Sequence, residues 1–431
     1  MSDPGSTGDL DAVVHDAAEV VVGPAEGAGA EAGAPPPQAD ELLERHEDAA
    51  VAVVDGRVAA AGPTEAVTRE YPPENAAEAV DAAGGAVIPG FVDAHTHALF
   101  AGDRSDEFEA KLRGKTYEDI LAEGGGILRT VGAVRAADDG TLLSNLLTHL
   151  DRMLAAGTTT VEVKSGYGLD VETELRMLDV IDRADRRHPV DVVPTFMGAH
   201  AVPEGLDSGE YVDRVVEDQI PAVADQGIAR FCDVFCEEGV FSVEESRRVL
   251  AAGAEAGMAP KVHAEELTHL GGTQLAAEVG ATSADHLLHA TDEDVSALRE
   301  AGVTPVLLPG TAFGLGAEYA DARRFLDGAS WDGAAPVAVA TDFNPNCYSR
   351  AMGFAASLSC VEMGMTPAES VLATTRGGAA ALDLDDGRGT LGEGAPADLA
   401  VLSAPSHRYV PYNFGETTVR TVLKEGERVH G

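Results

Sequence analysis

The alternation of short apolar runs with amphipathic helical patterns constrains the fold of this chain more than any other feature. Eight apolar runs occur between residues 87 and 340, and a helical pattern follows each one. The runs are Val87–Ala94, Thr158–Val163, Val190–Phe196, Ala229–Phe235, Ala259–His263, Thr282–Leu287, Thr304–Leu308 and Pro336–Ala340. We therefore predict an α/β fold, with residues 88–385 forming a (β/α)₈ TIM-like barrel. A doubly wound sheet would also alternate, but the count of eight and the chemistry at the strand ends favour the barrel.

The two ends of the chain carry short β-like runs. Asp55-Gly56, between the apolar stretches 49–54 and 57–61, is typical of a hairpin turn. Similar runs occur at 398–402 and 419–424. We predict that residues 1–87 and 386–431 together build one small β-sandwich. Residues 24–40 are rich in Ala, Gly, Pro and Glu, which cannot build a core, so we expect a flexible loop there.

The net charge of −43 on 431 residues excludes some classes of partner. Nucleic acid and acidic membranes would be repelled. The acidity runs along the whole chain, and lysine is scarce: Lys111, Lys115, Lys164, Lys261 and Lys424 are the only ones. This pattern indicates adaptation to molar salt, where the screening length falls to about 3 Å. The surface charge therefore reports habitat and not substrate.

We expect a soluble, cytoplasmic protein. No window approaches the ~20 apolar residues that a bilayer span requires, and the acidic N-terminus lacks the basic start and apolar core of a secretory signal. Four cysteines are too few for a disulfide scaffold, and we expect them to be buried thiols in a reducing compartment. They are Cys232, Cys236, Cys347 and Cys360.

Metal-binding residue types gather at the ends of four predicted strands. His95 and His97 end the first strand and, being two residues apart, face the same side. His263, His286 and Asp342 end the fifth, sixth and eighth strands. Functional groups in such barrels project from the C-terminal ends of the strands, so these side chains should meet at one mouth. Neutral imidazoles with one carboxylate suit a divalent zinc or iron ion.

At these residues the chain resembles the metal-dependent amidohydrolase superfamily, which also has a small β-sandwich built from both chain ends. The resemblance implies that His95, His97, His263 and Asp342 hold the metal. Binuclear members bridge two metals with a lysine on the fourth strand. The fourth strand here, 230–236, has no lysine, which implies one metal ion per chain.

Further segments make the resemblance more specific. They span the whole barrel in order and are 95–108, 124–127, 162–169, 196–203, 263–266, 284–286 and 341–345. Within the superfamily they are similar to the imidazolonepropionases. That similarity implies hydrolytic opening of the ring of 4-imidazolone-5-propanoate to N-formimidoyl-L-glutamate in histidine degradation, and a homodimer. One departure is Asn346 and Cys347, where family members often have Gly and then Ser or Thr.

The resemblance also implies roles for the residues that bind the substrate. Arg104 would hold the propionate carboxylate with a two-pronged pair, the geometry that a guanidinium favours. Tyr167 and His200 would complete the carboxylate and ring contacts. Asn344, Asn346 and Cys347 would contact substrate or product from the loop after the eighth strand.

Three residues are expected to take part in catalysis. Glu266, chosen over its neighbour Glu265, would accept a hydrogen bond from the ring N–H and so fix its tautomer and orientation. His286 would hydrogen-bond the attacking water and the substrate carbonyl oxygen. Asp342 would take a proton from the water and return it to the leaving ring nitrogen.

Two other functions remain open at this point. A related deaminase acting on cytosine or guanine would share the metal ligands but would not need Arg104, Tyr167 and His200 for an anionic tail. A non-catalytic metal-binding protein on the same fold would bind metal without turnover.

Overall fold

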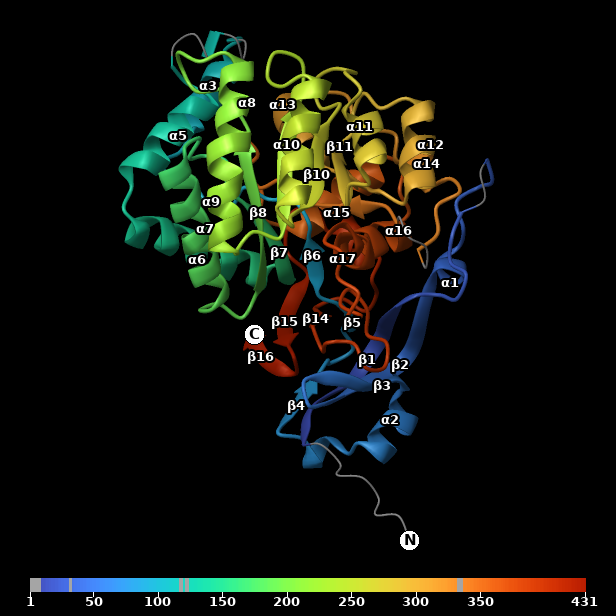
Figure 1. The fold of residues 1–431 in the computed structure, drawn as a ribbon. Helices are drawn as coiled ribbons and strands as arrows, with labels where there is room; N and C mark the ends of the chain where they lie inside the picture. The colour runs from blue at the N-terminus through green and yellow to red at the C-terminus, as the bar shows by residue number, and fades with distance from the viewer. Residues whose placement is uncertain (1–8, 31–32, 116–118, 121–123, 332–335) are drawn as a thin grey trace.

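The computed structural model describes residues 9–30, 33–115, 119–120, 124–331 and 336–431. Its largest unit is a barrel of eight parallel strands, which confirms the predicted fold class (Figure 1). In order around the barrel, the strands are β6 (Phe91–Asp93), β7 (Thr158–Lys164), β8 (Asp191–Ala199), β9 (Phe231–Cys236), β10 (Ala259–Ala264), β11 (Ser283–His286), β12 (Thr304–Leu307) and β13 (Ala338–Val339).

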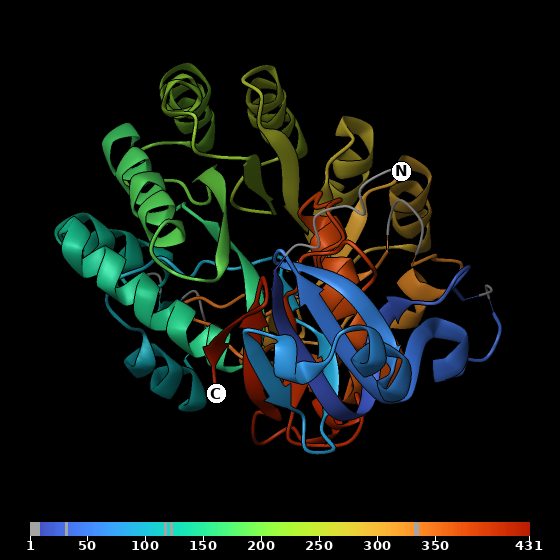
Figure 2. The same cartoon turned by 90° about the horizontal axis from the view of Figure 1, so that it is seen from below.

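Helices surround this barrel and bury its strands on the outer side (Figure 2). They are α3 (Ser105–Leu112), α5 (Ile127–Ala136), α6 (Asp139–Ala155), α7 (Val171–Asp185), α8 (Ser208–Arg214), α9 (Ile220–Gln226), α10 (Val243–Glu255), α11 (Gly272–Val279), α12 (Asp292–Ala301), α13 (Pro309–Leu315), α14 (Ala322–Leu326), α15 (Met352–Val361), α16 (Pro367–Leu372) and α17 (Gly378–Ala381). A π-helical turn, Val215–Gln219, joins α8 to α9. Because both faces of the strands are covered, they carry continuous apolar runs, and these runs identified them in the sequence.

The barrel closes between its first and last strands. The backbone N–H of Asp342 donates to the carbonyl of His95 at 3.0 Å, and that of His97 donates to the carbonyl of Phe343 at 2.9 Å. Thr341 donates from its N–H and its hydroxyl to the Asp93 carboxylate. This closure places the residues that follow β6 beside those that follow β13.

Both chain ends form one mixed sheet below the barrel, the predicted small domain (Figure 1). Its strands are β1 (Leu10–Pro24), β2 (Leu43–Val54), β3 (Arg57–Pro63), β4 (Glu78–Asp81), β5 (Ala86–Pro89), β14 (Leu399–Leu402), β15 (Val419–Lys424) and β16 (Glu427–His430). Two short helices, α1 (Ala39–Leu42) and α2 (Thr64–Glu70), contact β2, and a third, α18 (Tyr409–Tyr412), packs against α15 and α16. Asp55 and Gly56 both have positive φ and turn β2 into β3, as the hairpin motif predicted.

The apolar run Val87–Ala94 is two strands and not one. Its first part is β5, which pairs with β1 and β14 in the small sheet, and its second part is β6 of the barrel. Gly90 separates them, and a Cβ there would lie 2.3 Å from the Thr159 hydroxyl oxygen, so only glycine fits. The boundary predicted between residues 87 and 88 falls inside β5.

The loop expected over residues 24–40 is tied down in part. Ala28 is buried, and Gly29 and Ala30 form isolated bridges with Ser330 and Asp327. Residues 31–32 lie outside the described part of the chain. Within the described residues, no helix has the length and apolar character to cross a membrane.

Candidate active site

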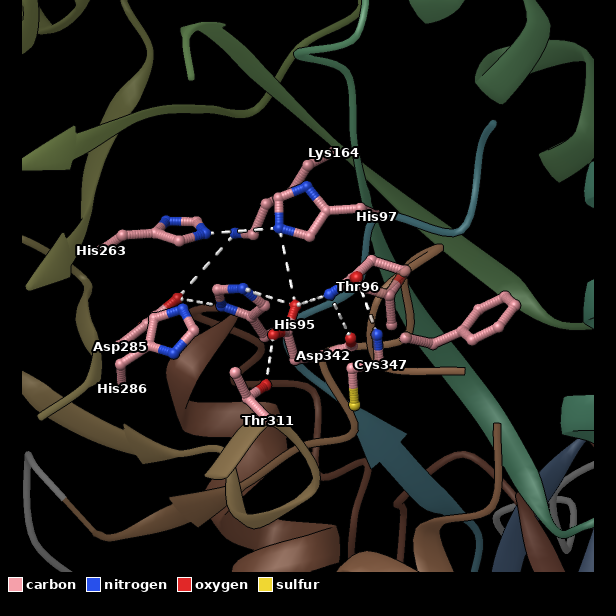
Figure 3. A network of polar contacts seen from close by, with 12 residues as sticks. His95, Thr96, His97, Lys164, His263, Asp285, His286, Thr311, Asp342 and Cys347 are labelled. Carbon is pink, nitrogen blue, oxygen red and sulfur yellow. Dashed lines mark hydrogen bonds and ion pairs between the residues drawn. The ribbon is translucent and has the colours of Figure 1, made fainter. Parts of the chain in front are cut away.

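The five predicted metal-site side chains meet at the C-terminal mouth of the barrel, and all are buried (Figure 3). Asp342 Oδ1 lies 3.6 Å from Nε2 of both His95 and His97. Nε2 of His263 lies 3.3 Å from Nε2 of His97. His286 joins His95 and His263 in a second group whose ligand atoms all lie within 4.8 Å of one another.

The backbone at three strand ends adopts an uncommon conformation, which aims His286 and Asp342 into this mouth and turns Glu265 towards the start of α11. Glu265, His286 and Asp342 have φ values of 51°, 80° and 49°. Positive φ is rare outside glycine and persists only where the surrounding structure enforces it, commonly at functional sites. The sharp change of direction after β10, β11 and β13 is therefore an independent indication of function.

The donor set fits a divalent metal. Nε2 of His95 is buried and has no hydrogen-bond partner among the described residues. Burial lowers the pKa of His95, His97 and His286 well below the usual value, so these imidazoles stay neutral and keep a free lone pair. Buried polar atoms without partners are costly, and an ion bound between these nitrogens and the Asp342 carboxylate would satisfy them.

Two carboxylates from inside the barrel orient the histidine rings. His95 Nδ1 donates to Asp285 Oδ2 at 2.6 Å, and His263 Nδ1 donates to Asp233 Oδ1 at 3.0 Å. Each bond uses Nδ1 and leaves the opposite nitrogen, Nε2, facing the mouth. Carboxylate–histidine pairs of this kind fix tautomer and orientation in metal sites.

No hydrogen bond joins Glu266 to His263. Glu266 therefore does not accept the ring N–H of that histidine. Its Oε2 lies 3.6 Å from His286 Nε2. Burial, with the charges of Asp342 and Glu237, raises the pKa of Glu266 to about 8. The neighbouring Glu265 instead accepts the backbone N–H groups of 271–273, which fixes the start of α11. Of the two glutamates, only Glu266 faces the mouth.

Tyr167 and His200 lie beside the histidine cluster. The His200 ring stacks on His97 with 4.7 Å between centroids, and the Tyr167 ring lies 5.3 Å from that of His200. Gly166 allows this approach, because a Cβ on it would lie 2.8 Å from the carbonyl oxygen of Met197. Both predicted substrate residues thus border the predicted metal site.

Arg104 directly precedes α3, in the segment that follows β6. Its Nε donates to Glu107 Oε2 at 2.6 Å. Burial and the positive charge of the nearby Arg104 lower the pKa of Lys111. Lys111 Nζ in turn donates to Asn346 Oδ1 at 2.8 Å. Sequence reasoning did not select Lys111, although it follows Arg104 by seven residues, two turns of a helix.

The loop after β13 is held by its own polar side chains. Asn344 Nδ2 donates to Asp342 Oδ1 at 3.0 Å, and its Oδ1 accepts the N–H groups of Asn346 and Cys347. The buried Cys347 thiol points to the carbonyl of Thr341. Thr311 on α13 donates its hydroxyl to the other oxygen of Asp342 (Figure 3). Asn344 and Thr311 therefore fix the carboxylate that the sequence singled out.

Sequence reasoning also missed the polar layer beneath the histidines. It consists of two lysines and three carboxylates, all fully buried: Glu162, Lys164, Asp233, Lys261 and Asp285. Period-two spacing could have found Lys261 and Glu162. Lys261 lies two residues before His263 and Glu162 lies two residues before Lys164, so each faces inward with its reference residue. Their pairing across strands could not be deduced without the barrel register.

Comparisons with known proteins agree with this geometry. A family model described as "Amidohydrolase family" matches residues 86–429. The chain is 69% identical over 420 residues to the imidazolonepropionase of Haloarcula marismortui, covering 97% of this chain and 96% of that protein. It is 49% identical over 398 residues to the imidazolonepropionase of Symbiobacterium thermophilum, covering 90% of this chain and 92% of that protein.

Solved structures with low sequence identity share the fold. An adenosine deaminase from Xanthomonas campestris with bound zinc superposes with a TM-score of 0.70 at 18% identity, covering 98% of this chain and 93% of that one. An atrazine chlorohydrolase from Arthrobacter aurescens, complexed with zinc, gives 0.70 at 17% identity, covering 97% and 95%. These likenesses support the architecture alone.

Proposed function

The chain belongs to the imidazolonepropionases of the metal-dependent amidohydrolase family, and from that premise we propose how its residues open the ring of 4-imidazolone-5-propanoate to give N-formimidoyl-L-glutamate. The observation that carries the proposal is the buried group of His95, His97 and Asp342, whose ligand atoms all lie within 4.8 Å of one another, with Nε2 of His263 3.3 Å from Nε2 of His97. These four residues would hold one divalent metal, zinc or iron.

The bond to be cut is a cyclic amide, which water attacks slowly at neutral pH. A divalent metal held there would supply the nucleophile, because it would lower the pKa of a bound water towards about 7. Asp342 accepts the proton of the attacking water and delivers it to the leaving ring nitrogen. Thr311 and Asn344 hold its carboxylate during both transfers.

Two residues handle the ring itself. His286 donates a hydrogen bond to the carbonyl oxygen, on which negative charge develops as the water adds. Glu266, on the same side of the mouth, accepts the ring N–H and so fixes the ring's orientation. Both side chains are buried or nearly so, which strengthens these electrostatic contacts.

The propionate tail would bind where the positive charges lie. Arg104 provides a guanidinium at the edge of the mouth, and Tyr167 and His200 complete the contact near the metal. In a protein with a net charge of −43, an anionic substrate needs such a local positive group. The deaminase alternative gives no use for this arrangement, because its substrates lack an anionic tail.

Arg104→Ala tests this assignment. A charge-assisted pair contributes about 1.5–3 kcal/mol, so kcat/KM for the natural substrate should fall at least about tenfold. Arg104→Lys should recover only part of the loss, because an ammonium lacks the two-pronged fork. Arg129→Ala is the matched control, since Arg129 pairs with Asp106 and Glu107 of the same helix from a more exposed position.

The deciding comparison uses an analogue without the carboxylate. Arg104→Ala should leave its kcat/KM unchanged and leave the bound metal in place. An equal loss on both substrates would refute the role of Arg104 in binding the tail. Ammonia release from cytosine or guanine, without turnover of imidazolonepropanoate, would refute the function itself.

The remaining attributes follow from the resemblance and from composition. We propose a cytoplasmic homodimer adapted to molar salt. Elemental analysis of the pure protein would identify the metal and its ratio to the chain, which we expect to be about one. Sedimentation in molar KCl would test the dimer.

A further inference from the structure

Directly beneath the histidine cluster lies the buried ammonium of Lys164, from the end of β7. Its Nζ lies 2.7 Å from Glu162 Oε2, 2.7 Å from Asp233 Oδ2 and 3.8 Å from Asp285 Oδ2. All four side chains are fully buried. The last two carboxylates are the ones that accept the Nδ1–H groups of His263 and His95. Figure 3 shows Lys164, Asp285 and His95 in this sequence.

This arrangement links one cation to two of the proposed metal ligands through two separate carboxylates. Asp233 uses Oδ1 for His263 and Oδ2 for Lys164, whereas Oδ2 of Asp285 contacts both His95 and Lys164. Neither carboxylate is exposed to water. A buried carboxylate without such a partner would be strongly destabilised in its charged form. If it turned away, it would no longer hold the imidazole with Nε2 facing the mouth.

We propose that Lys164 is a positioning residue for the metal site: its ammonium bonds to Asp233 and holds it in place, and Asp233 in turn holds the ring of His263. This inference rests on the metal site of the proposed function. Partners of this kind commonly change metal affinity by about 10- to 100-fold.

Lys261 provides a matched control within the same layer. It is as deeply buried as Lys164 and also bonds to Glu162, at 2.8 Å. Its second hydrogen bond goes to the backbone carbonyl of Ala94, and its Nζ is 4.0 Å from Asp285. Removing either lysine takes one charge from the buried layer, but only Lys164 bonds directly to a carboxylate that holds a ligand.

The experiment compares zinc affinity in the wild type, Lys164→Met and Lys261→Met, by chelator competition on the full chain in molar KCl. We expect a loss of at least about tenfold in Lys164→Met relative to Lys261→Met. The visible spectrum of the cobalt-loaded protein should change in the first variant and be retained in the second. The melting temperature of the metal-free proteins measures the stability that both variants lose.

Equal zinc affinity and equal cobalt spectra in the two variants would overturn the role of Lys164. If Lys164→Met is insoluble, Lys164→Gln takes its place, with the same expected loss, because an uncharged amide cannot replace the ammonium between Glu162 and Asp233. Wild-type affinity in that variant would also overturn the proposal. A wild-type protein that binds no zinc, iron or cobalt would instead refute the metal site on which the proposal depends.

Discussion

At the scale of single residues, the two oxygens of Asp342 make different contacts. One oxygen faces the imidazoles of His95 and His97, and the other accepts the hydroxyl of Thr311. Burial raises the pKa of Asp342 above its usual value, which favours a group that must accept a proton and release it again. Its left-handed backbone shows that the chain bends to present this side chain.

Asp342→Asn should separate metal binding from proton transfer. The amide keeps an oxygen for the metal but cannot accept the water's proton, so kcat should fall by at least about 100-fold. Metal content by elemental analysis should stay near that of the wild type. Near-normal turnover with the metal retained would show that another group acts as the base.

The residues that sequence reasoning could find are those whose type alone suggests chemistry. His95, His97, His263, His286 and Asp342 stand out at strand ends, and the structure brings them together. Asp233 and Lys164 did not stand out, because charged residues inside strands acquire meaning only from partners on other strands. Glu266 and Glu265 are adjacent in sequence, and only the backbone turn between them decides which one faces the mouth.

At the scale of elements, the strand pattern predicted all eight barrel strands, but it could not divide the run Val87–Ala94. Hydrophobicity continues through Gly90, because strands of both sheets are buried at this point. Periodicity reports burial and not the identity of the sheet. The division depends on long-range pairing of β5 with β14, which no local pattern encodes.

One contact between elements should make the free energy of unfolding depend on pH. Glu19 on β1 accepts hydrogen bonds from the backbone N–H and the ring of His407, which precedes α18. Burial alone would raise the pKa of Glu19, but the bonds and charge of His407 outweigh it and lower the pKa. The contact therefore stabilises the fold above the unfolded pKa, near 4.5, and is lost as the pH falls through the lower folded value.

Glu19→Gln should reduce the free energy of unfolding by about 1–3 kcal/mol at pH 7, measured by urea denaturation. The difference from the wild type should shrink as the pH is lowered below the folded pKa, where Glu19 is protonated in both states. Glu47→Gln is the control, because Glu47 contacts the same Arg45 from an exposed position. A difference that stays constant from pH 7 into the acid range would contradict the linkage.

At the scale of the whole molecule, 73 acidic residues face 30 lysines and arginines. Repulsion among the acidic side chains opposes the compact state. Salt weakens this repulsion, because the screening length falls from about 30 Å at 0.01 M to about 3 Å at 1 M. The melting temperature should therefore rise from dilute buffer to molar KCl. NaCl at equal concentration should act in the same way, and a flat or falling melting temperature would exclude screening as the cause.

The pairing of β5 with β14 can form only late in synthesis, because β14 follows the whole barrel in the sequence. Strands β1 to β5 leave the ribosome first, and the entire barrel is translated before β14, β15 and β16. Until then one edge of β5 presents backbone N–H and C=O groups without a partner strand. An open edge is a template for pairing with other chains. A chain truncated within the last three strands would thus keep every proposed catalytic residue in the barrel but expose the unpaired edge of β5. We expect such a product to aggregate.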